Sequence, residues 1–291
     1  MELAAAVERV WPGRGARFEV LGGGITNHNA KVLLDGEEPC VLRVAGHDTE
    51  LLGIDRNVEH AASLAAAAIG VGAEVLGFVE PEGWLVTRFI DGVHMPPEQM
   101  REPATLKRVA VTLRAIHAGP SVSGRFDSFR VVEEYLQTAL RRGGAEPTEF
   151  AWAHELAGRI ERARGGVERC LCHNDLLNAN FLDDGTRIRI VDWEYAGMGD
   201  RFFDLANFSI NHELDATQSE TLLSAYFGEV RTSHAQALEL MRFMSDFREA
   251  MWGVVQSAVS ELDFDFDSYA AEHFERLDRT ASSPAFVAAL S

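Results

Sequence analysis

Two carboxylates and one amide in the middle of the sequence have types and a spacing that could do chemistry. Asp175 and Asn180 lie in the segment His-Asn-Asp-Leu-Leu-Asn-Ala-Asn, and Asp192 follows the apolar pair Ile190-Val191. A carboxylate can accept the proton of a substrate hydroxyl, and the oxygens of an amide and a second carboxylate can hold Mg²⁺ against nucleotide phosphates. A surface turn with polar caps would explain a lone His-x-Asp. The full pattern, with a second Asp at the end of an apolar strand, predicts a phosphoryl-transfer site.

Two short predicted strands must position these side chains. Residues 170–172 lead into the motif, and residues 187–191 lead to Asp192. Strand, loop and strand would place Asp175 and Asn180 on one loop, with Asp192 beside them.

The pattern of the whole chain predicts an α+β protein with two lobes. Three strands, a helix and two strands are expected over 17–21, 30–34, 40–44, 55–68, 73–78 and 83–90. Helical periodicity follows at 96–117, 129–142 and 150–163, and again from 204 to a polar, Ser-rich tail. We therefore predict a small N-terminal lobe over 1–91, a β-sheet with one helix, and a larger, mainly helical lobe over 92–291.

The predicted N-terminal lobe contains a glycine-rich turn and a strand arginine. Residues 22–27 lie between two expected strands, where backbone amides can approach phosphates. An ordinary hairpin loop would explain three consecutive glycines equally well. Arg43 ends an expected strand, a position that more often carries a surface charge.

Composition restricts the partners of the chain. Its 291 residues carry 45 acidic and 27 basic side chains, a formal net charge of −18. Nucleic acid and anionic membranes both need basic patches, so neither is expected as a partner. The acidity could attract a cationic small molecule or could simply keep the protein soluble. The absence of a basic N-terminal start, of a long apolar run and of metal-type cysteine spacing predicts a cytoplasmic protein.

The motifs resemble those of a known family. Residues 173–180 and 190–204 are similar to the catalytic and metal-binding motifs of the choline/ethanolamine kinases, and residues 191–198 are especially similar to bacterial choline kinases. That family belongs with the aminoglycoside phosphotransferases to the protein-kinase-like small-molecule phosphotransferases. The resemblance implies a bilobal protein-kinase-like fold with ATP and Mg²⁺ as cofactors. It also implies three catalytic residues, with Asp175 as the base and Asn180 and Asp192 as the Mg²⁺ ligands, and it makes His173 and Asp204 braces of the loop.

The same resemblance implies a nucleotide site in the N-terminal lobe. The family has a similar Gly-Gly-hydrophobic-Ser/Thr-Asn turn, and an Arg-Glu pair takes the place of the Lys-Glu pair of protein kinases. Residues 87–90 would form the hinge beside the adenine. The implied nucleotide-binding residues are Gly23, Gly24, Thr26, Asn27, Arg43, Glu59, Arg88 and Phe89.

Near the C-terminus, residues 248–256 and 264–270 resemble the segment in which choline kinases build an aromatic cage. Aromatic faces attract quaternary ammonium ions by about 2 kcal/mol or more when desolvated. The chain departs from the family at Glu249, which stands where some members have a first Trp, and at Leu177, where eukaryotic members tend to have Gln. The implied substrate-binding residues are Asp175, Trp193, Glu194, Tyr195, Glu249 and Trp252.

We therefore expect an ATP-dependent kinase that phosphorylates the hydroxyl of choline or of a related amino alcohol such as ethanolamine, as a monomer or homodimer. The same fold could instead serve an aminoglycoside, a macrolide or thiamine. Two readings from other classes are a nucleotide-binding pseudokinase and a metal-dependent hydrolase that uses His173, Asp175 and Asp192.

Overall fold

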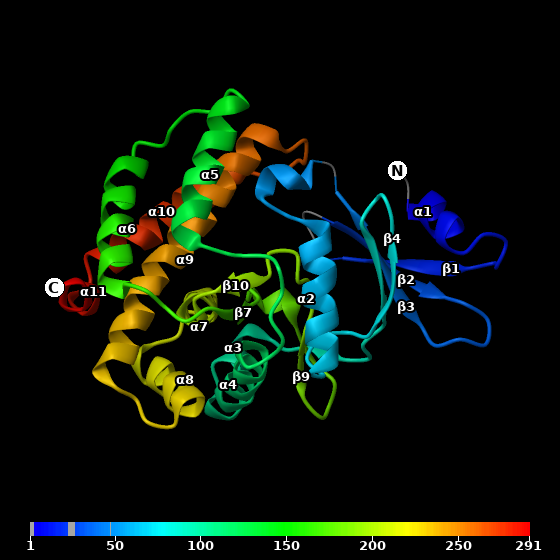
Figure 1. Ribbon diagram of the computed structural model, residues 1–291, viewed down its shortest axis with the longest axis horizontal. Coiled ribbons are helices and arrows are strands. Elements are labelled where there is room, and N and C mark those ends of the chain that lie inside the picture. The colour runs from blue at the N-terminus through cyan, green and yellow to red at the C-terminus, as the bar shows by residue number, and fades with distance from the viewer. Residues whose placement is uncertain (1–2, 23–26, 47) are drawn as a thin grey trace.

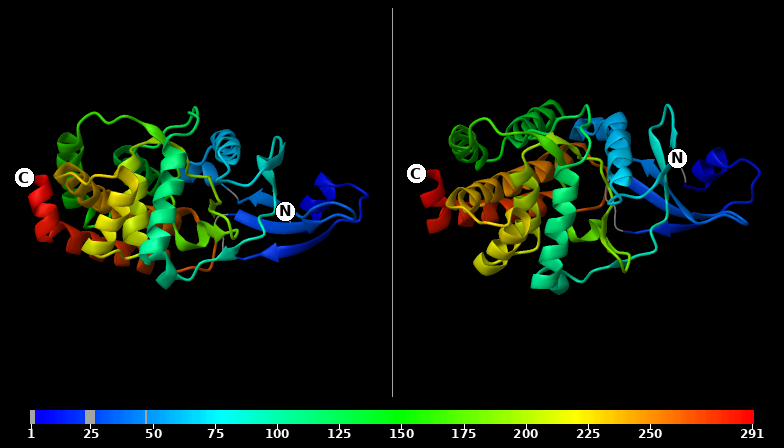
Figure 2. Two further views of the ribbon diagram at one scale, coloured as in Figure 1. Left: turned by 90° about the horizontal axis from the view of Figure 1, so that it is seen from below. Right: turned by 60° about the horizontal axis from the view of Figure 1, so that its bottom comes forward.

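The computed structural model describes residues 3–22, 27–46 and 48–291. An antiparallel five-stranded sheet at one end of the molecule adjoins a larger region of helices at the other (Figure 1). The prediction of an α+β protein with a small N-terminal sheet is confirmed. The C-terminus lies at the end of the molecule that is remote from the five-stranded sheet (Figure 2).

The N-terminal sheet has the strand order β1-β2-β3-β5-β4. Its strands are β1 (Arg17–Leu21), β2 (Asn27–Leu33), β3 (Cys40–Ala45), β4 (Val75–Val79) and β5 (Trp84–Arg88). Helix α1 (Leu3–Val10) packs Ala6 and Val7 onto the sheet beside Val32 and Leu42. Helix α2 (Arg56–Ala68) lies between the sheet and the helical region (Figure 1).

Local sequence explains where α2 begins and why it faces inward. The side chain of Asp55 accepts hydrogen bonds from the backbone N–H groups of Asn57 and Val58, at 2.9 and 3.3 Å, as a helix N-cap does. Ala62 and Ala66 are fully buried in the main core. These small side chains let α2 approach its neighbours closely. The short 3₁₀ helix η1 (Thr49–Leu52) precedes α2.

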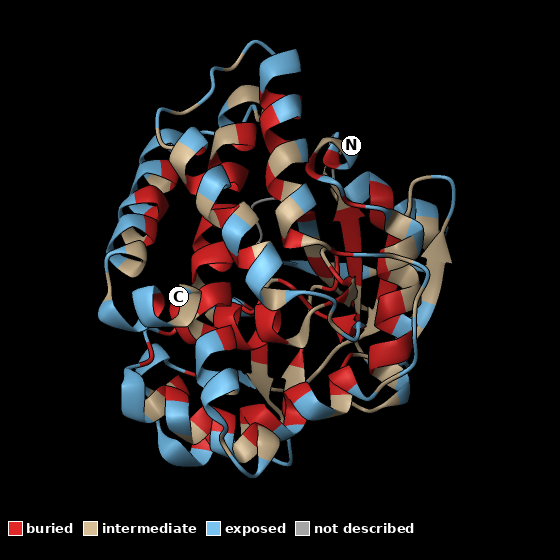
Figure 3. Cartoon of the chain, turned by 60° about the vertical axis from the view of Figure 1, so that its left-hand side comes forward, coloured by how far each residue is buried: buried red, intermediate tan, exposed pale blue. Residues whose placement is uncertain are grey.

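The helical region is built around the 28-residue helix α9 (Thr232–Val259), against which α5, α7, α10 and α11 pack. Buried residues line the faces that these helices turn toward one another (Figure 3). The other helices are α3 (Pro97–Met100), α4 (Pro103–His117), α5 (Ser128–Arg141), α6 (Phe150–Arg164), α7 (Arg201–Asn211), α8 (Ala216–Phe227), α10 (Phe266–Ala281) and α11 (Pro284–Leu290). None of the helices in the described part of the chain is both long enough and apolar enough to cross a bilayer.

Two small sheets position the central motif. Strand β7 (Cys170–Cys172) pairs with β10 (Gly197–Gly199), and β8 (Phe181–Asp183) lies between β6 (Val93–His94) and β9 (Ile188–Ile190). The 3₁₀ helix η2 (Asn178–Asn180) closes the loop before β8. The strand β5 of the N-terminal sheet ends at Arg88, and the next strand, β6, pairs with β8 of the helical region. A lobe boundary near residue 91 stays a prediction.

The structure corrects two element predictions. The single helix expected over 96–117 is broken into α3 and α4, because Pro103 begins a new helix and has no N–H with which to continue the previous one. The C-terminal tail, expected to be polar, contains α11. Ser283 caps this helix, and Phe286 is buried against Phe243 with ring centroids 5.3 Å apart.

Candidate active site between the two lobes

Helix α7 holds the loop that follows β7. The buried carboxylate of Asp204 accepts two backbone hydrogen bonds from this loop, from His173 N at 2.9 Å and Asn174 N at 2.7 Å. One turn later, Asn207 Oδ1 accepts from Leu176 N at 2.6 Å. Asn174 has a φ of 67°, so these bonds hold the loop in a left-handed turn that a non-glycine residue rarely adopts. The loop before Asp175 is therefore fixed by side chains of a neighbouring helix.

His117 and Tyr226 extend this support, and sequence reasoning missed both. His117 Nε2 lies 3.1 Å from Asp204 Oδ2, and its Nδ1 lies 2.7 Å from the Tyr226 hydroxyl. The sulfur atoms of Cys170 and Cys172 and a ring nitrogen of His117 all lie within 4.8 Å of one another. A neutral imidazole whose two nitrogens both face polar partners has no lone pair left for a metal. The cluster therefore supports the loop.

A substitution of Tyr226 tests this support. Tyr226→Phe removes the hydroxyl and leaves one buried ring nitrogen of His117 without a partner, so we expect a loss of about 1–3 kcal/mol in the free energy of unfolding. Urea denaturation measures it. In a His117→Leu background the same substitution should cost much less. An unchanged free energy of unfolding in the single variant would contradict this role.

The three predicted catalytic residues lie together. Asn180 Nδ2 donates to the backbone oxygen of Asp175 at 2.8 Å and to its Oδ2 at 3.2 Å. His173 Nε2 lies 3.0 Å from the carbonyl oxygen of Val191, which ties the loop to the chain just before Asp192. Asp192 has a φ of 66°, a second left-handed residue at the site. The loop that carries Asp175 and Asn180 is thus joined to the segment that carries Asp192.

Burial and neighbouring charges act in opposite directions on the pKa of Asp175. Burial raises the pKa of Asp175 to about 8, and Glu249 and Asp192 contribute in the same direction. Arg248 opposes the shift, with its Nη1 3.7 Å from Asp175 Oδ1. The net shift leaves the carboxyl largely protonated near neutral pH, and Arg248 limits that shift because a nearby cation favours the ionised form, the form that can accept a proton.

A buried polar cluster joins the two lobes beside this point. Arg43 on β3 forms an ion pair with Glu59 on α2, as the sequence predicted, and its Nη1 lies 2.6 Å from Asp192 Oδ1. Glu194 accepts from Asn27 Nδ2 at 2.8 Å. Burial raises the pKa of Glu194, and its neighbour Asp192 adds to the effect. Arg56 completes the cluster; sequence reasoning had assigned it no role.

The cluster fits a divalent cation. It contains the carboxylates of Glu59, Asp192 and Glu194 against the guanidinium groups of Arg43 and Arg56, which leaves one negative charge in excess. Oxygen ligands are those that Mg²⁺ prefers. Asp192 and the adjoining Asn180 could hold such an ion at the edge of the cluster. The positive charge of the ion would then offset the excess negative charge of the cluster.

A cavity of about 790 Å³ opens beside this cluster, between β3 and β5 on one side and β8 on the other. Four of the predicted nucleotide and metal residues that line it are Arg43, Phe89, Asn180 and Asp192. Arg88 also lines it, although its guanidinium pairs with Glu38 and Glu74. The remaining walls include the apolar side chains Leu21, Val41, Leu85, Ile90 and Leu182. Gly22 lines the cavity as well, whereas the predicted residues Gly23, Gly24 and Thr26 lie outside the described residues.

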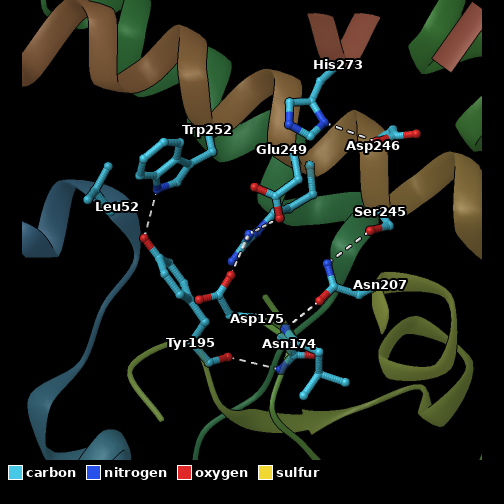
Figure 4. A network of polar contacts seen from close by, with 12 residues as sticks. Leu52, Asn174, Asp175, Tyr195, Asn207, Ser245, Asp246, Glu249, Trp252 and His273 are labelled. Atoms are coloured by element: carbon cyan, nitrogen blue, oxygen red, sulfur yellow. Dashed lines mark hydrogen bonds and ion pairs between the residues drawn. The ribbon is translucent and has the colours of Figure 1, made fainter. Parts of the chain in front are cut away.

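Near Asp175, aromatic and charged side chains of helix α9 and of the segment between β9 and β10 lie close together (Figure 4). Trp252 Nε1 donates to the Tyr195 hydroxyl at 2.9 Å, and the Tyr269 hydroxyl donates to Glu249 Oε2 at 2.9 Å. The rings of Trp252 and Tyr269 meet edge to face, with centroids 5.4 Å apart. We call the five residues Tyr195, Arg248, Glu249, Trp252 and Tyr269 the acceptor group.

Arg248 occupies the centre of the acceptor group. Its guanidinium lies 4.4 Å from the centroid of the Tyr195 ring, and Nη1 lies 2.5 Å from Glu249 Oε1. The side chain is only 1% exposed. Sequence reasoning assigned no role to Arg248 or Tyr269, although each lies in a segment that resembles the aromatic-cage segment of choline kinases.

Two predicted substrate residues lie elsewhere. The buried indole of Trp193 donates to the carbonyl oxygen of Ile190 at 3.1 Å and meets the ring of His173 edge-on, and Trp193 also lines the cavity. Glu194 faces Asn27 in the cluster between the lobes. Successive side chains of an irregular segment can point in different directions. Trp193 therefore packs beside the cavity, Glu194 lies in the cluster between the lobes, and Tyr195 belongs to the acceptor group. Asp175, Tyr195, Glu249 and Trp252 are the predicted substrate residues that the structure brings together.

Comparisons with known proteins agree with this geometry. Residues 17–240 match the model of the family described as "Phosphotransferase enzyme family". The solved structure of a choline/ethanolamine kinase family protein from Mesorhizobium loti is 31% identical, with a TM-score of 0.84, over 99% of this chain and 97% of the other. Human ethanolamine kinase 2 is 27% identical over 91% of this chain and 76% of its own. A structure of LicA in complex with AMP, 22% identical over 96% of each chain, has a similar fold with a TM-score of 0.78.

The family match spans most of the sequence, and the Mesorhizobium loti structure aligns with the chain over nearly its whole length. The resemblance found in the motifs is thereby confirmed. The chain belongs to the phosphotransferase enzyme family and, within it, to the choline/ethanolamine kinases.

Proposed function

We propose that this protein is an ATP- and Mg²⁺-dependent kinase that transfers the γ-phosphate of ATP to the hydroxyl of choline or of a related amino alcohol such as ethanolamine. One observation carries the proposal. Asp175 lies between the acceptor group, which it meets through Arg248, and the residues Asn180 and Asp192 at the edge of the cavity. The ethanolamine kinase among the relatives and the AMP complex of LicA support the same reading.

In this proposal Asp175 orients the acceptor hydroxyl and accepts its proton as the phosphoryl group is transferred. Asn180 holds the Asp175 carboxylate in place, and Arg248 favours its ionised form. Asn180 and Asp192 would hold Mg²⁺, which supplies positive charge to the phosphates when bound. Arg43 places a second positive charge at the same edge of the cavity.

The acceptor group favours a small cationic acceptor. Trp252 and Tyr269 offer aromatic rings to an ammonium group, and Glu249 offers a carboxylate. Hydrogen bonds and ring contacts join these side chains into one compact group, which suits a small amino alcohol better than a large antibiotic. We also expect a cytoplasmic monomer or homodimer, and the three free cysteines are in keeping with a reducing compartment.

A phosphorylation screen tests the proposal. Purified protein with MgATP would be offered choline, ethanolamine, thiamine and an aminoglycoside, and ADP release would be measured for each. We expect turnover with choline or ethanolamine. Turnover confined to thiamine or the aminoglycoside would overturn the choice of acceptor.

Replacing Trp252 tests the cation site. Trp252→Leu removes the aromatic face, so we expect the KM for the amino alcohol to rise about 30-fold, the equivalent of about 2 kcal/mol. The KM for MgATP should not change. Trp252→Phe keeps a ring and should lose less. Equal increases in both KM values would mean that Trp252 supports the fold and does not bind the acceptor.

A further inference from the structure

Arg56, in the first turn of α2, makes four polar contacts at the junction of the lobes. Its Nη2 donates to Asn27 Oδ1 at 3.1 Å and to Thr49 Oγ1 at 3.0 Å. Its Nη1 donates to Glu59 Oε2 at 2.6 Å and to Glu194 Oε2 at 3.3 Å. All four partners are buried. One guanidinium therefore ties together β2, η1, α2 and the segment after β9.

Three of these side chains form a closed ring. Asn27 accepts from Arg56 through Oδ1 and donates through Nδ2 to Glu194 Oε2, which also accepts from Arg56. Asn27 is the last residue of the predicted glycine-rich turn over 22–27 and the first residue of β2. Glu194 lies two residues after Asp192. The ring thus connects the chain that leaves the glycine-rich turn with the chain that carries a proposed metal ligand.

A second arginine makes the parallel connection. Arg43 joins Glu59 to Asp192, as Arg56 joins Glu59 to Glu194. Glu59 is thus shared by two guanidinium groups that each reach into the other lobe. Without Arg56, the buried carboxylates of Glu59 and Glu194 and the partly buried carboxylate of Asp192 would face one guanidinium group, that of Arg43. Their mutual repulsion would then act on the Asp192–Glu194 segment.

Only an arginine suits this position. A planar guanidinium presents two terminal nitrogens in a fixed fork, so it can hold acceptors in both lobes at a defined separation. The single ammonium of a lysine keeps the charge, but it cannot reproduce contacts that depend on two separate nitrogens.

We propose that Arg56 is a positioning residue for the Mg²⁺–nucleotide complex, holding Asn27 and the Asp192–Glu194 segment in the relative placement that the complex needs. This inference rests on the proposed function, since it assumes that the cavity binds MgATP. Arg56 acts through Asn27 and Glu194. Its effect should therefore depend on the metal, because one of the two segments that it joins carries the proposed ligand Asp192.

Calorimetric binding of a non-hydrolysable ATP analogue, without any acceptor, tests the proposal. For Arg56→Gln we expect affinity to fall by about tenfold or more with Mg²⁺, the equivalent of about 1.4 kcal/mol, and by no more than about threefold in EDTA. Arg56→Lys should fall between this variant and the wild type in Mg²⁺. Arg14→Gln is the matched control, because Arg14 pairs with Glu37 on the surface of the same lobe. Its affinity should equal that of the wild type.

Thermal unfolding establishes that each variant is folded, and Arg56→Lys provides the test if Arg56→Gln does not fold. Wild-type affinity in a folded Arg56 variant would overturn the proposal. So would equal losses with Mg²⁺ and with EDTA, because a merely structural role predicts no dependence on the metal. If the wild type binds the analogue but phosphorylates no amino alcohol, the proposed acceptor is wrong while the test of Arg56 stands.

Discussion

Replacing Asp175 with asparagine is expected to lower kcat by about 10²–10⁴-fold, the usual contribution of a general base. The amide has nearly the same shape as the carboxylate, but it cannot accept the proton of the acceptor hydroxyl. Asn180 can still donate to the backbone oxygen of residue 175, so the loop should keep its form. The measurement is steady-state turnover with MgATP and an amino alcohol, together with the affinity for a non-hydrolysable ATP analogue, which should be retained.

Asp184→Asn is the matched control for this substitution. Asp184 is a carboxylate of the turn between β8 and β9, where it accepts hydrogen bonds from Thr186 and Arg187. Its replacement should leave kcat close to that of the wild type. Full turnover by Asp175→Asn would remove Asp175 from the proposed chemistry. Absence of turnover in the wild type, with nucleotide binding intact, would favour a pseudokinase.

Replacing Asp204 with alanine should produce the largest loss of stability among the substitutions considered. The buried carboxylate accepts backbone hydrogen bonds from His173 and Asn174 and faces the imidazole of His117. Removing it leaves three buried polar groups without partners, and each such group typically costs about 1–3 kcal/mol, so we expect a loss of about 3 kcal/mol or more. Chemical denaturation measures this loss. We also expect kcat to fall in the folded fraction, because the loop before Asp175 loses its support.

Asp215→Ala is the control for Asp204→Ala. Asp215 caps α8 at the surface through a capping box with Gln218, so its loss should cost only about 1 kcal/mol. Equal losses in the two variants would show that Asp204 contributes no more than an exposed helix cap.

The elements of the fold were predictable where their signals are local. The alternation of β1, the largely apolar run of β3, the N-cap at Asp55 and the apolar approach to Asp192 each belong to a few consecutive residues. The break before α4 also had a local signal, because Pro103 disfavours a continuous helix. The helical periodicity on both sides of Pro103 nevertheless favours one continuous helix, which is why the prediction was wrong. The buried face of α11 was missed because its partner Phe243 is distant in sequence.

The site was predictable only in part, because its contacts join distant segments. The Asp175, Asn180 and Asp192 pattern indicated the site through residue types and spacing, whereas the Arg43–Glu59 pair was implied by the family resemblance. Arg56 and His117 gave no such signal. Arg56 meets Glu194 across 138 positions and His117 meets Asp204 across 87, and nothing in the residues themselves indicates such partners.

The acceptor group illustrates the same limit. The sequence showed that Glu249 stands where some members of the family have a Trp. It did not show that Glu249 forms a buried ion pair with the adjacent Arg248. Arg248 covers the ring of Tyr195 and so occupies a face to which a cationic acceptor could bind. The aromatic faces of Trp252 and Tyr269 therefore become the more important candidates for holding the ammonium group.

The most direct test of the central proposal is ³¹P NMR of the products formed by the wild-type protein from MgATP and an amino alcohol. We expect the signal of a phosphomonoester of choline or ethanolamine to appear together with ADP, and to be absent with Asp175→Asn. Release of inorganic phosphate without a phosphomonoester, or no consumption of ATP with either alcohol, would contradict the proposal.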